Sequence, residues 1–166
     1  ITGNTTEIRA GPGGFFVQAD ASVRLDGGML RSDVGVTIRE GGLLEGVGSI
    51  VGSVINAGVL RPGDPLGALD VDGNFAQAAT GLLEIEIAVT TPGILHDRLT
   101  VTGNAGLGGT LSIIRPNGFV PATGDRFDVI THTSVTGGFT TITGESIDFD
   151  RHFTTTVSAN AVTLLV

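Results

Sequence analysis

The densest cluster of polar side chains in the sequence is Asp148-Phe-Asp-Arg-His152. If this segment formed a strand, Asp148, Asp150 and His152 would share one face, because strand side chains alternate between the two faces. Two carboxylates on one face could act as acid and base in the cleavage of a glycosidic bond. A solvent-facing edge on which Arg151 screens the acids explains the same residues without chemistry, and we assign no catalytic residue here.

Asp70, Asp72 and Asn74 form a second group, within the sequence Asp-Val-Asp-Gly-Asn. Carboxylates two residues apart can point at one cation, as they do at the start of a calcium loop. The segment lacks a third acid and the closing glutamate of an EF-hand, so weak calcium binding is the most that it predicts. The simpler interpretation is a strand that ends in an Asp-Gly-Asn turn.

A third group, His96-Asp97-Arg98, places an imidazole, a carboxylate and a guanidinium in succession. Neighbours in a strand point to opposite faces, so we expect these three side chains to have structural or solvated roles. The sequence has no cysteine, which excludes disulfides, thiolate zinc sites and a cysteine nucleophile. It also has no Gly-x-Ser-x-Gly elbow, phosphate loop or His-Glu-x-x-His motif. We therefore expect no enzymatic activity, no cofactor and no catalytic metal.

The charge of the chain narrows the possible partners. Among 166 residues there are 17 acids and nine arginines but no lysine, which gives a net charge of −8. Such an acidic chain has no electrostatic reason to bind nucleic acid or anionic lipid. No run of apolar residues reaches the roughly 18 that a membrane span needs, so we also expect no direct membrane insertion.

The elements that hold these residues are expected to be short strands and turns. The chain has 27 glycines and 21 threonines, and glycine or proline interrupts nearly every window that could form a helix. In the first half, apolar pieces of two to five residues alternate with glycine turns. Pieces this short are typical of a β-solenoid, in which each coil contributes brief strands and glycine makes the corners.

The pattern changes near residues 73–81. From Leu83 the segment Gly81–Val89 alternates apolar with acidic residues, which predicts one buried and one wet face. The segments Leu99–Thr102 and Thr110–Ile114 read as longer strands joined by a hairpin-like glycine-rich link. We therefore divide the chain into solenoid coils at 1–80 and a C-terminal β region at 81–166 that packs on them.

A series of motifs over residues 42–166 resembles the passengers of bacterial autotransporters and related large surface adhesins. The series opens with Gly46-Val-Gly-Ser-Ile-Val-Gly-Ser-Val-Ile-Asn-Ala-Gly-Val-Leu-Arg-Pro-Gly63. It continues with Leu69-Asp-Val-Asp-Gly-Asn-Phe75, Gly81-Leu-Leu-Glu-Ile-Glu-Ile87, His96-Asp-Arg-Leu-Thr-Val-Thr-Gly103, Leu107-Gly-Gly-Thr-Leu111, Gly118-Phe-Val-Pro-Ala-Thr-Gly-Asp-Arg-Phe127 and Gly137-Gly-Phe139. The order and spacing of these motifs carry the resemblance.

This resemblance implies an all-β fold: a right-handed parallel β-helix (β-solenoid) followed by a β-sandwich-like C-terminal cap. It implies a non-enzymatic structural module outside the cell, at the bacterial surface, that reaches a glycan or host-cell ligand through its parent protein. A self-assembling extracellular fibre or matrix subunit and a carbohydrate-active β-helix are the alternatives. Solenoid ends and an edge strand at Val162, Leu164 and Val166 are the expected sites of self-association.

Overall fold

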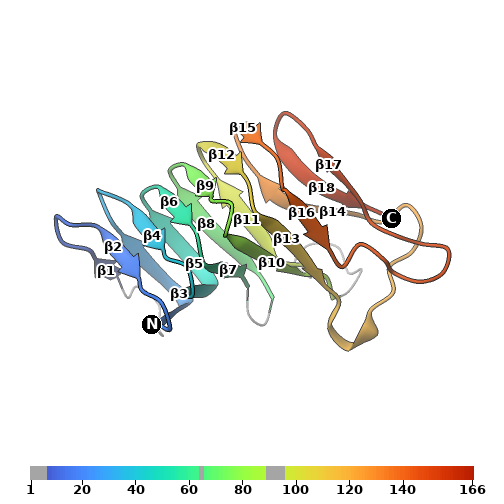
Figure 1. Ribbon diagram of the computed structural model, residues 1–166, viewed down its shortest axis with the longest axis horizontal. Helices are drawn as coiled ribbons and strands as arrows, with labels where there is room; N and C mark the ends of the chain where they lie inside the picture. Colours follow the sequence, from blue (N-terminus) through green and yellow to red (C-terminus); the bar gives the residue numbers. More distant parts are fainter. Residues whose placement is uncertain (1–6, 64–65, 89–95) are drawn as a thin grey trace.

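The chain is almost entirely β-structure, as its composition predicts. The computed structural model describes residues 7–63, 66–88 and 96–166. Within these ranges there is one 3-10 helix, Pro116–Gly118, and no α-helix. The strands form a twelve-stranded curled sheet and a six-stranded sheet. They stack along the long axis of the molecule, and β1 (Glu7–Arg9) and β18 (Ala161–Leu165) lie at opposite ends (Figure 1).

The six-stranded sheet is parallel throughout. Its strands follow chain order: β2 (Phe15–Val17), β4 (Val36–Ile38), β6 (Val54–Asn56), β9 (Phe75–Gln77), β12 (Asn104–Leu107) and β15 (Ser134–Gly137). Equivalent residues form straight columns, because Val36 lies beside Val54, Val54 beside Phe75 and Phe75 beside Ala105. All four side chains point into the core.

The twelve-stranded sheet has two arms, because β3 (Ser22–Arg31) and β5 (Leu43–Val51) are long enough to run through both. The first half of β5 pairs with β7 (Val59–Pro62), and its second half pairs with β8 (Ala68–Asp72). The first arm continues from β7 in parallel through β10 (Leu82–Glu86), β13 (Thr110–Ile114) and β16 (Thr141–Thr143).

The second arm continues from β8 in parallel to β11 (Arg98–Val101) and β14 (Arg126–Thr131). Two antiparallel strands then extend it. β18 pairs with β14, and β17 (Thr154–Val157) pairs with β18. Among the named strands of the described residues, antiparallel pairing therefore occurs only at the end of the molecule that carries the C-terminus, apart from isolated antiparallel bridges.

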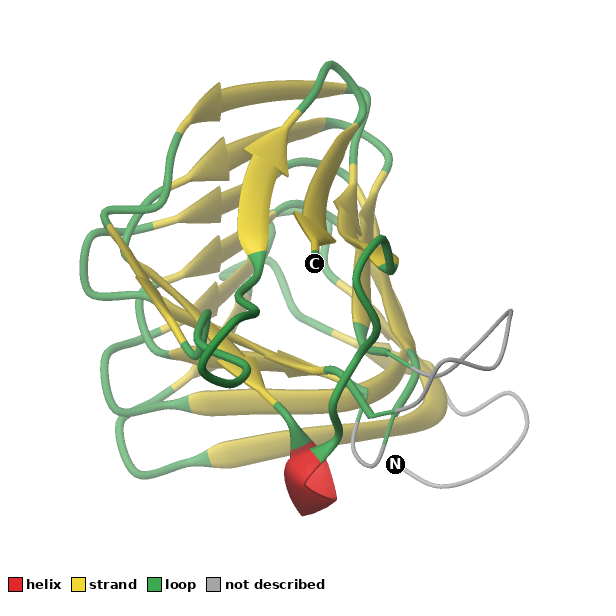
Figure 2. Cartoon of the chain, turned by 90° about the vertical axis from the view of Figure 1, so that its right-hand side faces the viewer, coloured by secondary structure: helices red, strands yellow, loops and turns green. Residues whose placement is uncertain are grey.

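The chain visits the six-stranded sheet, the first arm and the second arm in a repeating order. We call one such visit a pass; β6, β7 and β8 make one pass, and β9, β10 and β11 make the next. Seen along the long axis, the strands surround a central core (Figure 2). The core is continuous because each pass adds one inward column position, as in the fully buried series Leu44, Leu60, Leu83 and Leu111.

Two features of the second half differ from the sequence prediction. The segments 98–101 and 110–114 are strands, but β11 and β13 lie in different arms and do not pair with each other. The glycine-rich segment between them is not a hairpin link, since it contains β12 of the six-stranded sheet. Parallel pairing also runs across residues 80–81 without a break, because β10 pairs with both β7 and β13. Val89, the last residue of the expected strand, lies outside the described residues.

Candidate functional site

The cluster at Asp148–His152 forms a tight loop rather than the strand considered above. The two oxygens of Asp148 point back into this loop: Oδ1 accepts hydrogen bonds from the backbone N–H groups of Asp150 (3.1 Å) and Arg151 (3.0 Å), and Oδ2 accepts one from Arg151 Nε (2.9 Å). Asp148, Asp150 and His152 therefore do not share a strand face. The hydrogen bonds from Arg151 lower the pKa of Asp148, so this carboxyl group stays ionised and is unsuited to general-acid catalysis.

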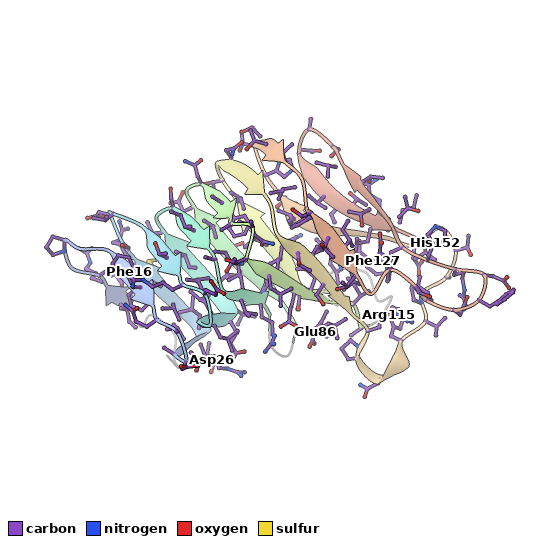
Figure 3. The ribbon with its side chains drawn as sticks, in the orientation of Figure 1. Phe16, Asp26, Glu86, Arg115, Phe127 and His152 are labelled. Carbon is purple, nitrogen blue, oxygen red and sulfur yellow. The ribbon has the colours of Figure 1, made fainter. Side chains whose placement is uncertain are left out.

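Two arginines join this loop to the other loop at the same end of the molecule. We call residues 115–125 and 144–153 the end loops. Arg115 donates from Nη2 to the Ser146 carbonyl oxygen (3.0 Å), and Arg151 donates from Nη1 to the Pro121 carbonyl oxygen (2.7 Å). Figure 3 labels Arg115, Phe127 and His152 at this end of the molecule. The charged cluster thus fastens two loops over the end of the core.

Aromatic side chains fill the space at this end. Phe127 and Phe153 are buried and meet edge to face, with ring centroids 6.1 Å apart. His96 packs on Phe127 in the same way at 5.5 Å, and its Nε2 lies 3.2 Å from the backbone oxygen of Asp128. Burial lowers the pKa of His96, because a charged imidazole is poorly solvated there. His96 is therefore a neutral part of the core end at pH 7.

Two of the calcium candidates lie on the outside of β8 and the third lies in the turn that follows it, and two of the three accept hydrogen bonds from other residues. Asp70 and Asp72 are both exposed on β8. Asp72 Oδ1 accepts a hydrogen bond from Thr102 Oγ1 (3.1 Å), and Asn74 Oδ1 accepts one from the backbone N–H of Asn104 (2.9 Å). Asn74 thus links adjacent passes. In the ranges 7–63, 66–88 and 96–166, no group of three or more histidine, aspartate or glutamate side chains is placed to hold a metal ion.

The structure assigns Asp97 a role that neighbouring residue types alone do not reveal. Its side chain is fully buried, Oδ1 accepts a hydrogen bond from the Gly67 N–H (3.2 Å), and Oδ2 accepts one from the Glu86 N–H (2.9 Å). The acceptor therefore connects the second arm to the end of β10. This agrees with a structural role, but the partners come from segments distant in sequence, which local patterns cannot supply.

The structure also contains a pair of buried amide side chains that the sequence analysis did not predict. Asn56 and Gln77 occupy the same inward column at the corner after the six-stranded sheet. Asn56 Nδ2 donates to the Leu82 carbonyl oxygen (3.0 Å), and Gln77 Nε2 donates to the carbonyl oxygens of Gly108 (2.9 Å) and Thr110 (2.8 Å). These hydrogen bonds tie the two buried amides to the backbone of the neighbouring strands and turns.

The structure corrects the expectation that Val162, Leu164 and Val166 form an edge strand. β18 lies between β14 and β17, so its backbone is paired on both sides, and Val162 and Leu164 are fully buried. Val166 also bonds through its backbone to Gly124 and Asp125. At this end the edge strands are β15, β16 and β17, and the terminal position of β18 in the sequence does not make it an edge strand.

Comparison with known proteins does not assign a family, because no protein-family model matches the chain and no curated protein matches it significantly. No helix within the described ranges is long and apolar enough to cross a membrane.

Proposed function

We propose that this chain is a non-enzymatic structural module of a secreted or surface-displayed bacterial protein. In this proposal the passes form a right-handed parallel β-helix that acts as a rigid spacer. The end loops, β17 and β18 form a cap that closes the core. The spacer holds a binding region of the parent protein away from the cell and resists proteases.

The observation that carries the proposal is the alignment of equivalent residues over successive passes. Leu44, Leu60, Leu83 and Leu111 are fully buried and lie in one column of the first arm. Val36, Val54, Phe75 and Ala105 form a matching column in the six-stranded sheet. A core that repeats along the axis supports an elongated, rigid structure and does not depend on one central pocket. A spacer requires this property.

The C-terminal end supports the capping part of the proposal. A further parallel pass would have to pair with the outer edge of β14, and β18 already occupies this edge in the antiparallel direction. The end loops add Ile147 and Phe153 to the core, and both side chains are buried. Closing the last pass protects its apolar side chains and its backbone from water and from other chains.

The polar clusters also favour a structural role, because their polar side chains are hydrogen-bonded within the chain. Asp148 is bound by Arg151, Asn74 by the next pass and Asp97 by two backbone N–H groups. Each of these hydrogen bonds fixes a loop or joins neighbouring passes.

A self-assembling fibre subunit is the second candidate, and the distribution of exposed apolar side chains favours it. Of the seven large apolar side chains that are exposed among the described residues, only Ile55 lies midway along the axis. Phe16 and Val34 lie near the N-terminal end, and the others lie near the C-terminal end: Val120, Phe149, Val157 and Leu165. Apolar groups at both ends could support contacts between copies.

Labelling with antibodies tests the surface location. Antibodies raised against the folded chain should label intact cells that express the parent protein, or detect the protein in the medium. Labelling that requires permeabilised cells would contradict the proposal. Electron microscopy and light scattering of the purified chain over a range of concentrations distinguish the two candidates, because a spacer stays monomeric and a fibre subunit forms polymers.

Removal of one pass tests the spacer mechanism. Deleting Val36–Ser53 joins Gly35 to Val54, which occupies the same column position as Val36. The deletion also removes Glu45 from between Arg24 and Arg61, so the variant carries Arg24→Glu to avoid two adjacent positive charges. If the passes are interchangeable, this variant folds with unchanged β circular dichroism and is shorter by about one strand spacing, roughly 4.8 Å. Loss of folding would contradict interchangeable passes.

A further inference from the structure

His132 lies where the last parallel strand meets the terminal antiparallel strands. It directly follows β14, one residue beyond the paired residues Thr100 and Thr131. Continuing this register places it beside Val101, which itself lies beside Val71 in the buried column of the second arm. The His132 side chain is only 6% exposed. An imidazole therefore occupies a position that the two preceding passes fill with valine.

The ring of His132 is buried without hydrogen bonds. Neither Nδ1 nor Nε2 has a partner among the described residues. Burial lowers the pKa of His132 below its ordinary value of 6.5, and no other cause contributes. A neutral imidazole tolerates this position far better than an imidazolium, which would bring a charge into apolar surroundings with no acceptor for its two N–H groups.

The charged groups on the neighbouring elements do not offset such a charge. β11 carries Arg98, and β14 carries Arg126 and Asp128; Arg98 and Arg126 are exposed on the outer face. Asp128 is already bonded to Arg126 and to Thr163 Oγ1. β15, β18 and the turn 158–160 contain no titratable side chain. A proton on His132 would therefore meet no carboxylate on the inner face.

The backbone of His132 links this position to the terminal hairpin. Its N–H donates to the Asn160 carbonyl oxygen (3.0 Å), directly beyond the pairing of Thr131 with Ala161. Asn160 belongs to the turn that joins β17 to β18, in which Ser158 N–H donates to the Ala161 carbonyl oxygen. A displacement of His132 toward water would thus act on the end of the β14–β18 ladder and on the hairpin turn.

We propose that His132 is an acid-sensitive latch for the β17–β18 hairpin: protonation of its buried ring releases the hairpin from β14. Release exposes the edge of β14 and the inward side chains of β18. In neutral surroundings the hairpin stays closed, and in acidic surroundings the C-terminal end opens while the earlier passes stay folded.

The direction of the pH dependence follows from the lowered pKa. The released state binds the proton on His132 more readily than the closed state does. The closed state is therefore fully stable above about pH 6.5, the ordinary histidine value. Its stability falls as the pH drops from 6.5 toward the pKa in the closed state, and below that pKa the loss is complete. His96 also has a lowered pKa and adds acid sensitivity at this end, so the test compares variants that all retain His96.

Hydrogen exchange of the full chain at pH 7.5 and 5.0 tests the latch, with protection factors corrected for the intrinsic pH dependence of exchange. In the wild type, the amides of 154–157 and 161–165 should lose protection at pH 5.0. The loss is about tenfold for each pH unit below 6.5 until the closed-state pKa is reached. The amides of β6 and β9 should stay protected. In His132→Val, which continues the valine column, the hairpin should lose much less protection at pH 5.0 than it does in the wild type, because only the acid sensitivity that His96 adds remains.

The exposed His152 supplies the matched control, because His152→Val removes an exposed imidazole from the same end and should leave the wild-type response unchanged. Equal loss of hairpin protection in wild type and His132→Val would overturn the proposal, as would a hairpin that stays protected at pH 5.0 in the wild type. If His132→Val does not fold, His132→Gln serves as the non-titrating variant. Titration of the wild type by NMR is independent of any variant, and a His132 pKa at or above 6.5 would also overturn the latch.

Discussion

Arg61 on β7 donates a hydrogen bond from Nε to Oε2 of Glu84 on the neighbouring strand β10, at 2.8 Å. On its other side, Arg61 Nη1 donates to Glu45 Oε2 at 3.2 Å, so the guanidinium bridges three passes on the outer surface of the first arm. Burial opposes the charge of Arg61, but hydrogen bonds and Coulombic attraction from Glu84 and Glu45 outweigh it and raise its pKa above the usual value. Glu45, Arg61 and Glu84 thus form a column of alternating charges along the axis, which we call the charge ladder.

Arg61→Met should lower the free energy of unfolding by about 1–2 kcal/mol, because it leaves two half-buried carboxylates, one on each flanking pass, without their shared donor. Urea denaturation measures this loss. Arg9→Met is the matched control, since the Arg9–Glu7 pair is exposed and should change stability by less than about 0.5 kcal/mol. Glu84→Ala should lie between the two variants, because Arg61 keeps Glu45. Equal stability of Arg61→Met and wild type would contradict a stabilising ladder.

Much of the local structure follows from the sequence because its signals are local. The apolar pieces at 15–17, 54–55 and 59–60 are strands or lie within strands. Leu83, Ile85 and Ile87 are fully buried, as their alternation with acids predicts. Parallel pairing was not predicted for the second half, because the partner of each strand lies a whole pass away. Glycine-rich corners of such passes and hairpin turns contain the same residue types.

Asp97→Ala should destabilise the chain by about 2–5 kcal/mol, since it leaves the N–H groups of Gly67 and Glu86 buried without their acceptor. Thermal and urea unfolding measure the loss. Asp97→Asn keeps one acceptor oxygen and should cost less. Asp70→Ala removes an exposed carboxylate from the same arm and should change stability by less than about 0.5 kcal/mol. If Asp97→Ala and Asp70→Ala behave alike, Asp97 does not hold these segments.

Gly46→Ala should be strongly destabilising, by about 2–4 kcal/mol, because backbone of the preceding pass fills the space for a side chain. A Cβ atom at Gly46 would lie 1.9 Å from the Leu25 carbonyl oxygen, and the residue has φ of 109°. A Cβ atom at Gly13 would meet nothing within 4 Å, so Gly13→Ala is the control and should be nearly neutral. Comparison of the two melting temperatures tests whether passes stack this closely.

The candidate sites could be predicted less completely than the strands. Sequence analysis correctly gave Asp97 a structural role, but its partners lie in other segments of the chain. The cluster Asp148–His152 was considered as a strand, whereas Asp148 binds the N–H groups of its own loop. Short-range hydrogen bonds of this kind compete with strand formation and are common for aspartate. The sequence around His132 does not indicate that its side chain is buried. Only its alignment with the valines of the two preceding passes shows that it occupies a core position.

Ile85→Asp tests the register of β10. Ile85 is fully buried beside Ile113, so an aspartate there should cost more than about 4 kcal/mol or prevent folding, because an ionised carboxylate is poorly solvated in the core. Ile55→Asp is the matched control, since Ile55 is 50% exposed on the outer face of β6. Chemical denaturation should show a small change for Ile55→Asp. Similar losses in both variants would show that one face is misassigned.

Truncation from each end tests whether the N-terminal and C-terminal strands contribute differently to the stability of the fold. Removal of residues 1–41 deletes β1 to β4 and leaves β5 as the first strand, with all later passes and the closed C-terminal end intact. Removal of Phe139–Val166 deletes β16, β17 and β18, and so uncovers β13, β14 and the buried Phe127.

We expect the chain that starts at residue 42 to fold as a monomer with cooperative thermal unfolding. The chain that ends at residue 138 should aggregate or be digested by protease, because it exposes the unpaired edges of two central strands and the apolar end of the core. Size-exclusion chromatography and limited proteolysis compare the two truncations. The opposite order of stability would mean that the C-terminal strands and end loops do not close the core, and it would remove the basis for a capping role.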